Sequence, residues 1–65
     1  MRDVKTVAEA YLFGSISADE VADWVYELAY EMACEIDSPN SRDFSSLSSG
    51  FEESLFEQLH NYGVL

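Results

Sequence analysis

Apolar residues recur at helical spacing in three stretches of the chain. Between residues 17 and 37 they fall three or four positions apart, which is the pattern of a helix with one buried face. This set comprises Val21, Trp24, Val25, Leu28, Ala29, Met32 and Ile36. Ser17 and Glu20 form a capping box at the start of the stretch, and Pro39 follows its end. The sequence therefore predicts one long helix over residues 17–37.

Two shorter stretches show the same spacing. The first covers residues 4–13, with Asp3 placed to cap its start and Gly14 placed to close its end. The second covers residues 50–62, where a second capping box opens the helix and Gly63 closes it. The apolar positions are Val4, Val7, Ala8, Tyr11 and Leu12 in the first stretch and Phe51, Leu55, Phe56, Leu59 and Tyr62 in the second.

Residues 38–49 are rich in serine and contain the single proline, so we expect a connection here, with one irregular helical turn around residues 43–47 and with Phe44 and Leu47 tying it to the helices. The link between the first two predicted helices is short, and these helices should form an antiparallel hairpin. The sequence therefore predicts an all-α fold, a single domain of residues 1–65 built as a small three-helix bundle with a long central helix. A chain of 65 residues has a small core, which homodimerisation would enlarge.

The polar side of the long predicted helix carries acidic residues only. Five of them fall within a band roughly 120° wide, at about 100° per residue. This acidic row consists of Glu20, Asp23, Glu27, Glu31 and Glu35. No Lys or Arg occurs between residues 6 and 41, although Glu–Lys pairs four residues apart stabilise a helix and like charges at that spacing destabilise it. The carboxylates of the row therefore repel one another, and one or two lysines among them would relieve that repulsion.

Aromatic residues flank the acidic row. Trp24 lies between the row and the apolar stripe, and Tyr26 and Tyr30 lie one turn apart on the other flank. Acidic residues beside aromatic ones suit protein recognition. The alternative is a solvated face whose aromatic side chains pack on neighbouring helices. The candidate partner-binding residues are Glu20, Asp23, Trp24, Tyr26, Glu27, Tyr30, Glu31 and Glu35.

Thirteen acidic and three basic residues give the chain a net charge of −10. This charge argues against direct binding of nucleic acid or of an anionic membrane, and it favours a basic protein partner. Cys34 is the only cysteine, which suits a reducing cytosol, and we expect it to be half-buried as a small apolar residue. No apolar run reaches the length of a membrane span and no signal peptide is evident, so we expect a cytoplasmic protein.

The sequence contains no catalytic motif. Glu57 and His60 form a Glu-x-x-His pair with Glu53 one turn earlier, but di-iron bundles need two such pairs and two further glutamates. Cys34 has no histidine near it in sequence, and the serines of residues 38–49 lack the setting of a nucleophile. We therefore expect no enzymatic activity, no metal site and no cofactor.

In its small size, strong acidity and lack of catalytic motifs, the chain resembles phage-encoded anti-CRISPR and anti-restriction proteins. The resemblance implies an inhibitor that acts in the bacterial host cytoplasm by imitating nucleic acid. Its target would be a basic, nucleic-acid-binding protein such as the DNA-binding subunit of a CRISPR effector complex. Seven acids on a helix roughly 30 Å long give one carboxylate per about 4–5 Å, against one phosphate per about 3.4 Å along a DNA strand.

Two alternatives stay open. The segment of residues 8–24 looks like the helix–turn–helix opening of small acidic helical bacterial proteins, bacteriocin immunity proteins among them. That resemblance implies an immunity protein or antitoxin that neutralises a basic nuclease or toxin. The other alternative is a non-inhibitory helical adaptor subunit, whose functional surface would be apolar and formed by Phe44, Phe51 and Phe56.

Overall fold

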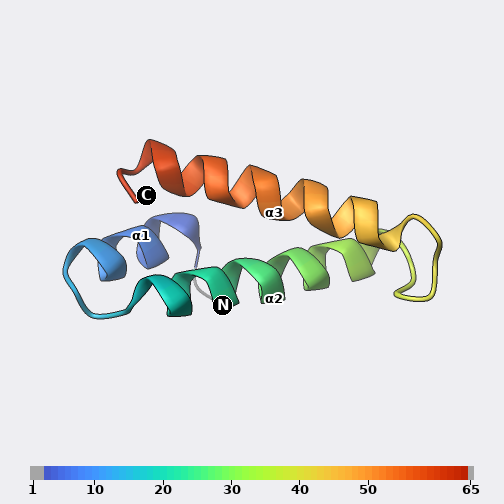
Figure 1. The fold of residues 1–65 in the computed structure, drawn as a ribbon, viewed down its shortest axis with the longest axis horizontal. Coiled ribbons are helices and arrows are strands. Elements are labelled where there is room, and N and C mark those ends of the chain that lie inside the picture. Colours follow the sequence, from blue (N-terminus) through green and yellow to red (C-terminus); the bar gives the residue numbers. More distant parts are fainter. Residues whose placement is uncertain (1–2, 65) are drawn as a thin grey trace.

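Three α-helices pack together in the computed structural model, which describes residues 3–64 (Figure 1). They are α1 (Val4–Leu12), α2 (Ala18–Ile36) and α3 (Phe44–Asn61), and residues 3–64 contain no β-strand. α2 and α3 run antiparallel along the whole molecule, while α1 covers only the half that contains the start of α2 and the end of α3 (Figure 1). The prediction of an all-α three-helix bundle is confirmed.

Capping interactions fix where α1 and α2 begin. The Thr6 backbone N–H donates a hydrogen bond of 2.8 Å to the Asp3 carboxylate, and the Glu20 N–H donates one of 3.3 Å to the Ser17 hydroxyl. Each bond satisfies a free amide of a first helical turn. The bond from Thr6 stabilises the charged carboxylate and lowers the pKa of Asp3 from its ordinary value of 3.8. The Asp3 cap therefore stabilises α1 fully above that value, and the stabilisation is lost as the pH falls through the lowered pKa.

Glycines in the left-handed conformation end α1 and α3. Gly14 has φ +81° and Gly63 has φ +91°. At the end of α3 the Gly63 N–H donates to the His60 carbonyl at 2.9 Å, and the Val64 N–H donates to the Leu59 carbonyl at 3.0 Å. This pair of bonds is a Schellman motif, and it brings Val64 back into the core. The predicted closing role of both glycines is confirmed.

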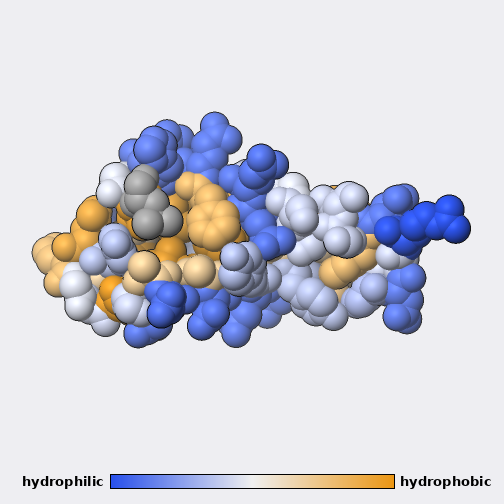
Figure 2. Space-filling model, viewed as in Figure 1, coloured by the Kyte–Doolittle hydropathy of each residue, from blue (hydrophilic) through white to orange (hydrophobic). Residues whose placement is uncertain are grey.

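The core lies where all three helices meet. Its buried residues are Val7, Ala8, Val21, Val25, Ala29, Leu55, Leu59 and Val64. Figure 2 shows hydrophobic residues gathered over this end of the molecule, whereas the half built from α2 and α3 alone is mainly hydrophilic on the same face. Leu12, Ile36 and Tyr62, which belong to the predicted apolar stripes, are 59%, 66% and 48% exposed. They are exposed because they lie in or just after the last turn of their helices, beyond the packed segments.

α3 begins at Phe44, so the predicted helix start at residue 50 was wrong and only residues 38–43 of the predicted connection lie between the helices. The helical turn expected around residues 43–47 is the first turn of α3. The Phe44 side chain is buried, and its ring packs edge to face on Tyr30 of α2 at a centroid distance of 5.3 Å. Leu47, one turn later, is half-buried, so both expected anchors are helical residues. The serines beside them cost a helix roughly 0.5 kcal/mol each, and the burial of the two apolar side chains offsets that cost.

Replacing Phe44 with alanine is expected to fray the first turns of α3, because it removes the buried side chain that holds them to α2. The local loss should be about 3 kcal/mol. Amide hydrogen exchange should become faster in residues 45–50 while residues 56–61 stay protected. Ser46→Ala, an exposed change in the same turn, is the matched control. Equal acceleration along the whole of α3 would contradict a local role for Phe44.

Candidate partner-binding surface

The acidic row lies in solvent, and four of its members lie on the edge of α2 that points away from α3. The residues of α2 that are buried recur every fourth position, as Val21, Val25, Ala29 and Ala33. Two positions after each of them, about 200° further round the helix, comes an acidic residue. These are Asp23, Glu27, Glu31 and Glu35, all of them exposed. Glu20 is exposed in the first turn of α2, where the helix dipole favours its charge.

A shallow hollow lies on one flank of the acidic row. It is lined by Tyr26, Glu27, Tyr30 and Glu31, has a volume of about 330 Å³ and is open to solvent. We call it the tyrosine hollow. The two tyrosines are 52% and 50% exposed. Their phenol rings, one turn apart on α2, therefore present apolar surface beside two carboxylates.

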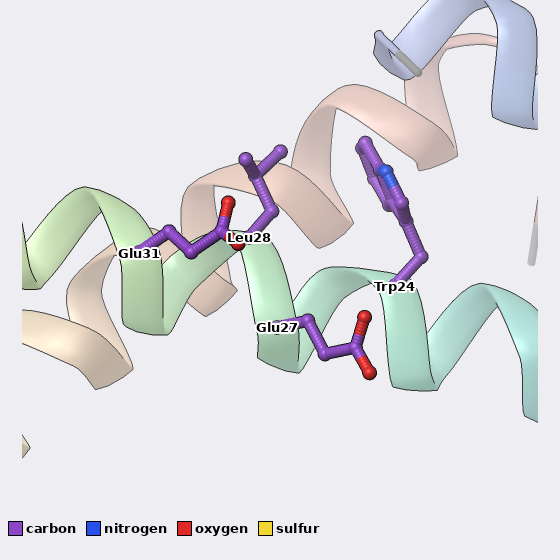
Figure 3. Close-up of a pocket in the computed structure, with 4 residues that line it drawn as sticks. All are labelled: Trp24, Glu27, Leu28 and Glu31. Carbon is purple, nitrogen blue, oxygen red and sulfur yellow. The ribbon is translucent and has the colours of Figure 1, made fainter. Parts of the chain in front are cut away.

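A second hollow of about 270 Å³, the tryptophan hollow, lies on the opposite flank and is lined by Trp24, Glu27, Leu28 and Glu31 (Figure 3). Trp24 and Leu28 project from the same side of α2 and pack against the core (Figure 3). The indole Nε1 of Trp24 is buried and finds no hydrogen-bond acceptor among the residues that the structure describes. A buried donor without an acceptor destabilises a fold by about 1–3 kcal/mol. The indole N–H of Trp24 therefore lowers the stability of the bundle.

Glu27 and Glu31 line both hollows and are the centre of the candidate surface. The structure brings these two residues together with Trp24, Tyr26 and Tyr30. Glu20, Asp23 and Glu35, the other candidate residues, extend the negative charge along α2 and line neither of these hollows. One helix thus carries the whole candidate surface.

Two phenylalanines of α3 support the tyrosine hollow. The alternative in which aromatic side chains of the long helix pack on a neighbouring helix is therefore confirmed for Tyr26 and Tyr30, although the particular rings of α3 were not predicted. The Phe56 ring meets Tyr26 edge to face at a centroid distance of 6.2 Å, and Phe44 meets Tyr30 in the same way. Local sequence patterns carry no signal for these contacts, because they join residues far apart in the chain. The adaptor alternative places its functional surface at Phe44, Phe51 and Phe56, but Phe44 is buried and the other two are half-buried in the bundle.

Cys34 is exposed, which corrects the expectation of a half-buried residue. Ala33 takes the position that faces α3 in this turn. Cys34 lies 100° further round the helix, and its thiol is therefore turned away from the core.

Residues 3–64 hold no group of three or more acidic, histidine or cysteine side chains arranged to bind a metal ion. Glu53, Glu57 and His60 are exposed on α3. In the part of the chain that the structure describes, no helix is long and apolar enough to cross a membrane. Comparison with known proteins gave no match: no protein family, no curated protein and no solved structure is significantly similar to this chain. A function must therefore be inferred from the geometry and charge of α2.

Trp24→Phe is expected to keep the free energy of unfolding within about 1 kcal/mol of the wild type. The change loses part of the buried ring, but it also removes the indole N–H that lacks an acceptor. Trp24→Ala, which removes the whole ring, should destabilise the fold by about 3 kcal/mol. Urea unfolding followed by circular dichroism measures both. A phenylalanine variant as unstable as the alanine variant would contradict this interpretation of the indole.

Proposed function

We propose that this chain is an acidic protein-binding inhibitor that mimics nucleic acid. It would act without catalysis, by occupying the DNA-binding surface of a bacterial defence complex, as anti-CRISPR proteins of this type do. The observation that carries the proposal is the row Asp23, Glu27, Glu31 and Glu35, exposed along one edge of α2 with no basic residue on the helix.

The spacing of the row supports mimicry of a nucleic-acid strand. Residues four apart on a helix are about 6 Å apart along its axis, which is close to two steps of about 3.4 Å between phosphates on a DNA strand. The row runs along α2, and α2 lies along the 39 Å axis of the molecule (Figure 1). A partner that grips alternate phosphates with Arg and Lys would meet carboxylates at a matching repeat.

The net charge of −10 adds long-range attraction to a basic partner. Attraction of this kind raises the association rate and weakens as salt is added. The same surface would also suit an immunity protein or antitoxin that blocks a basic nuclease, so the identity of the target distinguishes these two inhibitory functions.

The double reversal Glu27→Lys with Glu31→Lys is expected to abolish inhibition and leave the fold intact. It places cations where the partner's cations would bind. It also replaces two of the like-charge contacts along α2 with opposite-charge contacts, so the Tm should stay equal or rise. The measurement is binding of the captured bacterial partner to duplex DNA, with each variant added as the competitor.

Glu53→Lys with Glu57→Lys is the matched control for this test. These two glutamates are exposed on α3 at the same four-residue spacing, and their reversal changes the net charge equally. Inhibition should survive in the control. If both double variants lost inhibition equally, total charge rather than the acidic row would be responsible, and full inhibition by the Glu27/Glu31 variant would refute the proposal.

Immobilised wild-type protein should capture its partner from a bacterial lysate at low salt and release it when duplex DNA is added. Release is expected because DNA and the acidic row compete for the same cations. A salt gradient should elute the same partner. A partner that stays bound in the presence of excess DNA and high salt would instead indicate an apolar interface, as in the adaptor alternative.

A further inference from the structure

The tyrosine hollow has a composition that the rest of the acidic row lacks. Tyr26 and Tyr30 form two half-exposed aromatic walls, and Glu27 and Glu31 each follow one of them in the chain. A cation that enters the hollow meets aromatic rings and carboxylates together. The hollow is open to solvent and shallow, so it fits a side chain presented by another protein better than a small molecule that needs enclosure.

Contacts with α3 hold these aromatic walls in place. Tyr26 meets Phe56 at an interplanar angle of 78°, and Tyr30 meets Phe44 at 75°. Edge-to-face contacts of this kind stabilise a pair of rings beyond the burial of their area. The two tyrosine rings are thus fixed before a partner arrives, and binding loses little side-chain entropy there.

We infer that the tyrosine hollow binds an arginine side chain of the protein partner, with the guanidinium against Tyr26 and Tyr30 and paired with Glu27 and Glu31. The inference rests on the proposed function, since it names the side chain by which the partner is recognised. A guanidinium is planar and weakly hydrated, stacks on aromatic rings and forms two parallel hydrogen bonds with a carboxylate. A lysine ammonium is compact and strongly hydrated, and it gains less from the rings.

The tryptophan hollow is a weaker candidate for the same ligand. Trp24 and Leu28 pack against the core, and the indole is only partly exposed. Its polar N–H is buried, so it offers no hydrogen bond to a partner. Glu27 and Glu31 serve both hollows, but the accessible aromatic surface lies on the tyrosine side.

The test compares octa-arginine with octa-lysine, two peptides of equal charge, by calorimetric titration at low salt. Wild-type protein should bind octa-arginine about fivefold more tightly, given the strength of cation–π contacts at exposed sites. In the double variant Tyr26→Leu with Tyr30→Leu, the preference for octa-arginine over octa-lysine should fall to about twofold or less. The affinity for octa-lysine should stay nearly unchanged. Tyr62→Leu is the matched control, because Tyr62 is a half-exposed tyrosine at the end of α3 that lines neither the tyrosine hollow nor the tryptophan hollow.

Nuclear magnetic resonance of the wild-type protein tests the inference without any substitution. Octa-arginine should give intermolecular contacts between arginine side-chain protons and the rings of Tyr26 and Tyr30, with smaller shifts at Tyr62. Equal affinity for the two peptides, or contacts confined to other parts of the surface, would overturn the arginine site. Either result would leave the proposed inhibitor standing, because only the Glu27/Glu31 reversal and DNA competition decide that proposal.

Discussion

Close packing of α2 on α3 is the interaction on which the rest of the structure depends. The buried residues of α2 are small or β-branched, and three of them, Val21, Val25 and Ala29, share the core with Leu55 and Leu59 of α3. The full buried set of α2 is Val21, Val25, Ala29 and Ala33, each 0–1% exposed. α1 completes the core at one end only (Figure 1). The contact with α3 thus sets the rotation of α2 about its own axis, and that rotation directs the acidic row into solvent.

The acidic row destabilises the fold that displays it. Three pairs of like charges four residues apart, from Asp23 to Glu35, cost roughly 0.2–0.5 kcal/mol each. Glu35 lies at the C-terminal end of α2, where the helix dipole disfavours negative charge, and no basic residue is present in the last turn. A domain of this size has a stability of roughly 3–10 kcal/mol. One lysine in the row would recover part of the loss, so its absence favours a role for the charge outside the fold.

Features that depend on neighbouring residues could be predicted from the sequence, whereas features that depend on contacts between helices could not. The caps at Asp3 and Ser17 and the ends at Gly14 and Gly63 were predictable, because each depends on a few neighbouring residues. The start of α3 was not predictable. Serines favour turns in isolation, and the contact that makes them helical joins Phe44 to Tyr30 across two helices.

The candidate surface likewise has one part that local sequence patterns predict and one part that depends on contacts between helices. Helical periodicity alone was enough to place the acidic row on one exposed edge, with aromatic residues on each flank. Periodicity gives no information on which rings of α3 meet Tyr26 and Tyr30, so the supported tyrosine hollow emerged only from the structure. The burial of Cys34 was wrongly predicted for a related reason. Its neighbour Ala33, rather than Cys34, holds the position that faces α3.

A single helix in this protein supplies both the core contact and the candidate surface, with the two sets of residues offset by two positions. An offset of two turns the side chain about 200°, so a substitution in the acidic row leaves the buried face untouched. Tyr26 and Tyr30 differ from the residues of the acidic row in this respect, because each of them contacts α3 and also borders the row. Charge along the edge can therefore change at little cost to the fold, whereas a change at Tyr26 or Tyr30 alters packing and surface together. The shape of the surface is thus more strongly constrained than its charge, and the presence of the full row of charges despite its cost in stability is the physical argument for the proposed binding role.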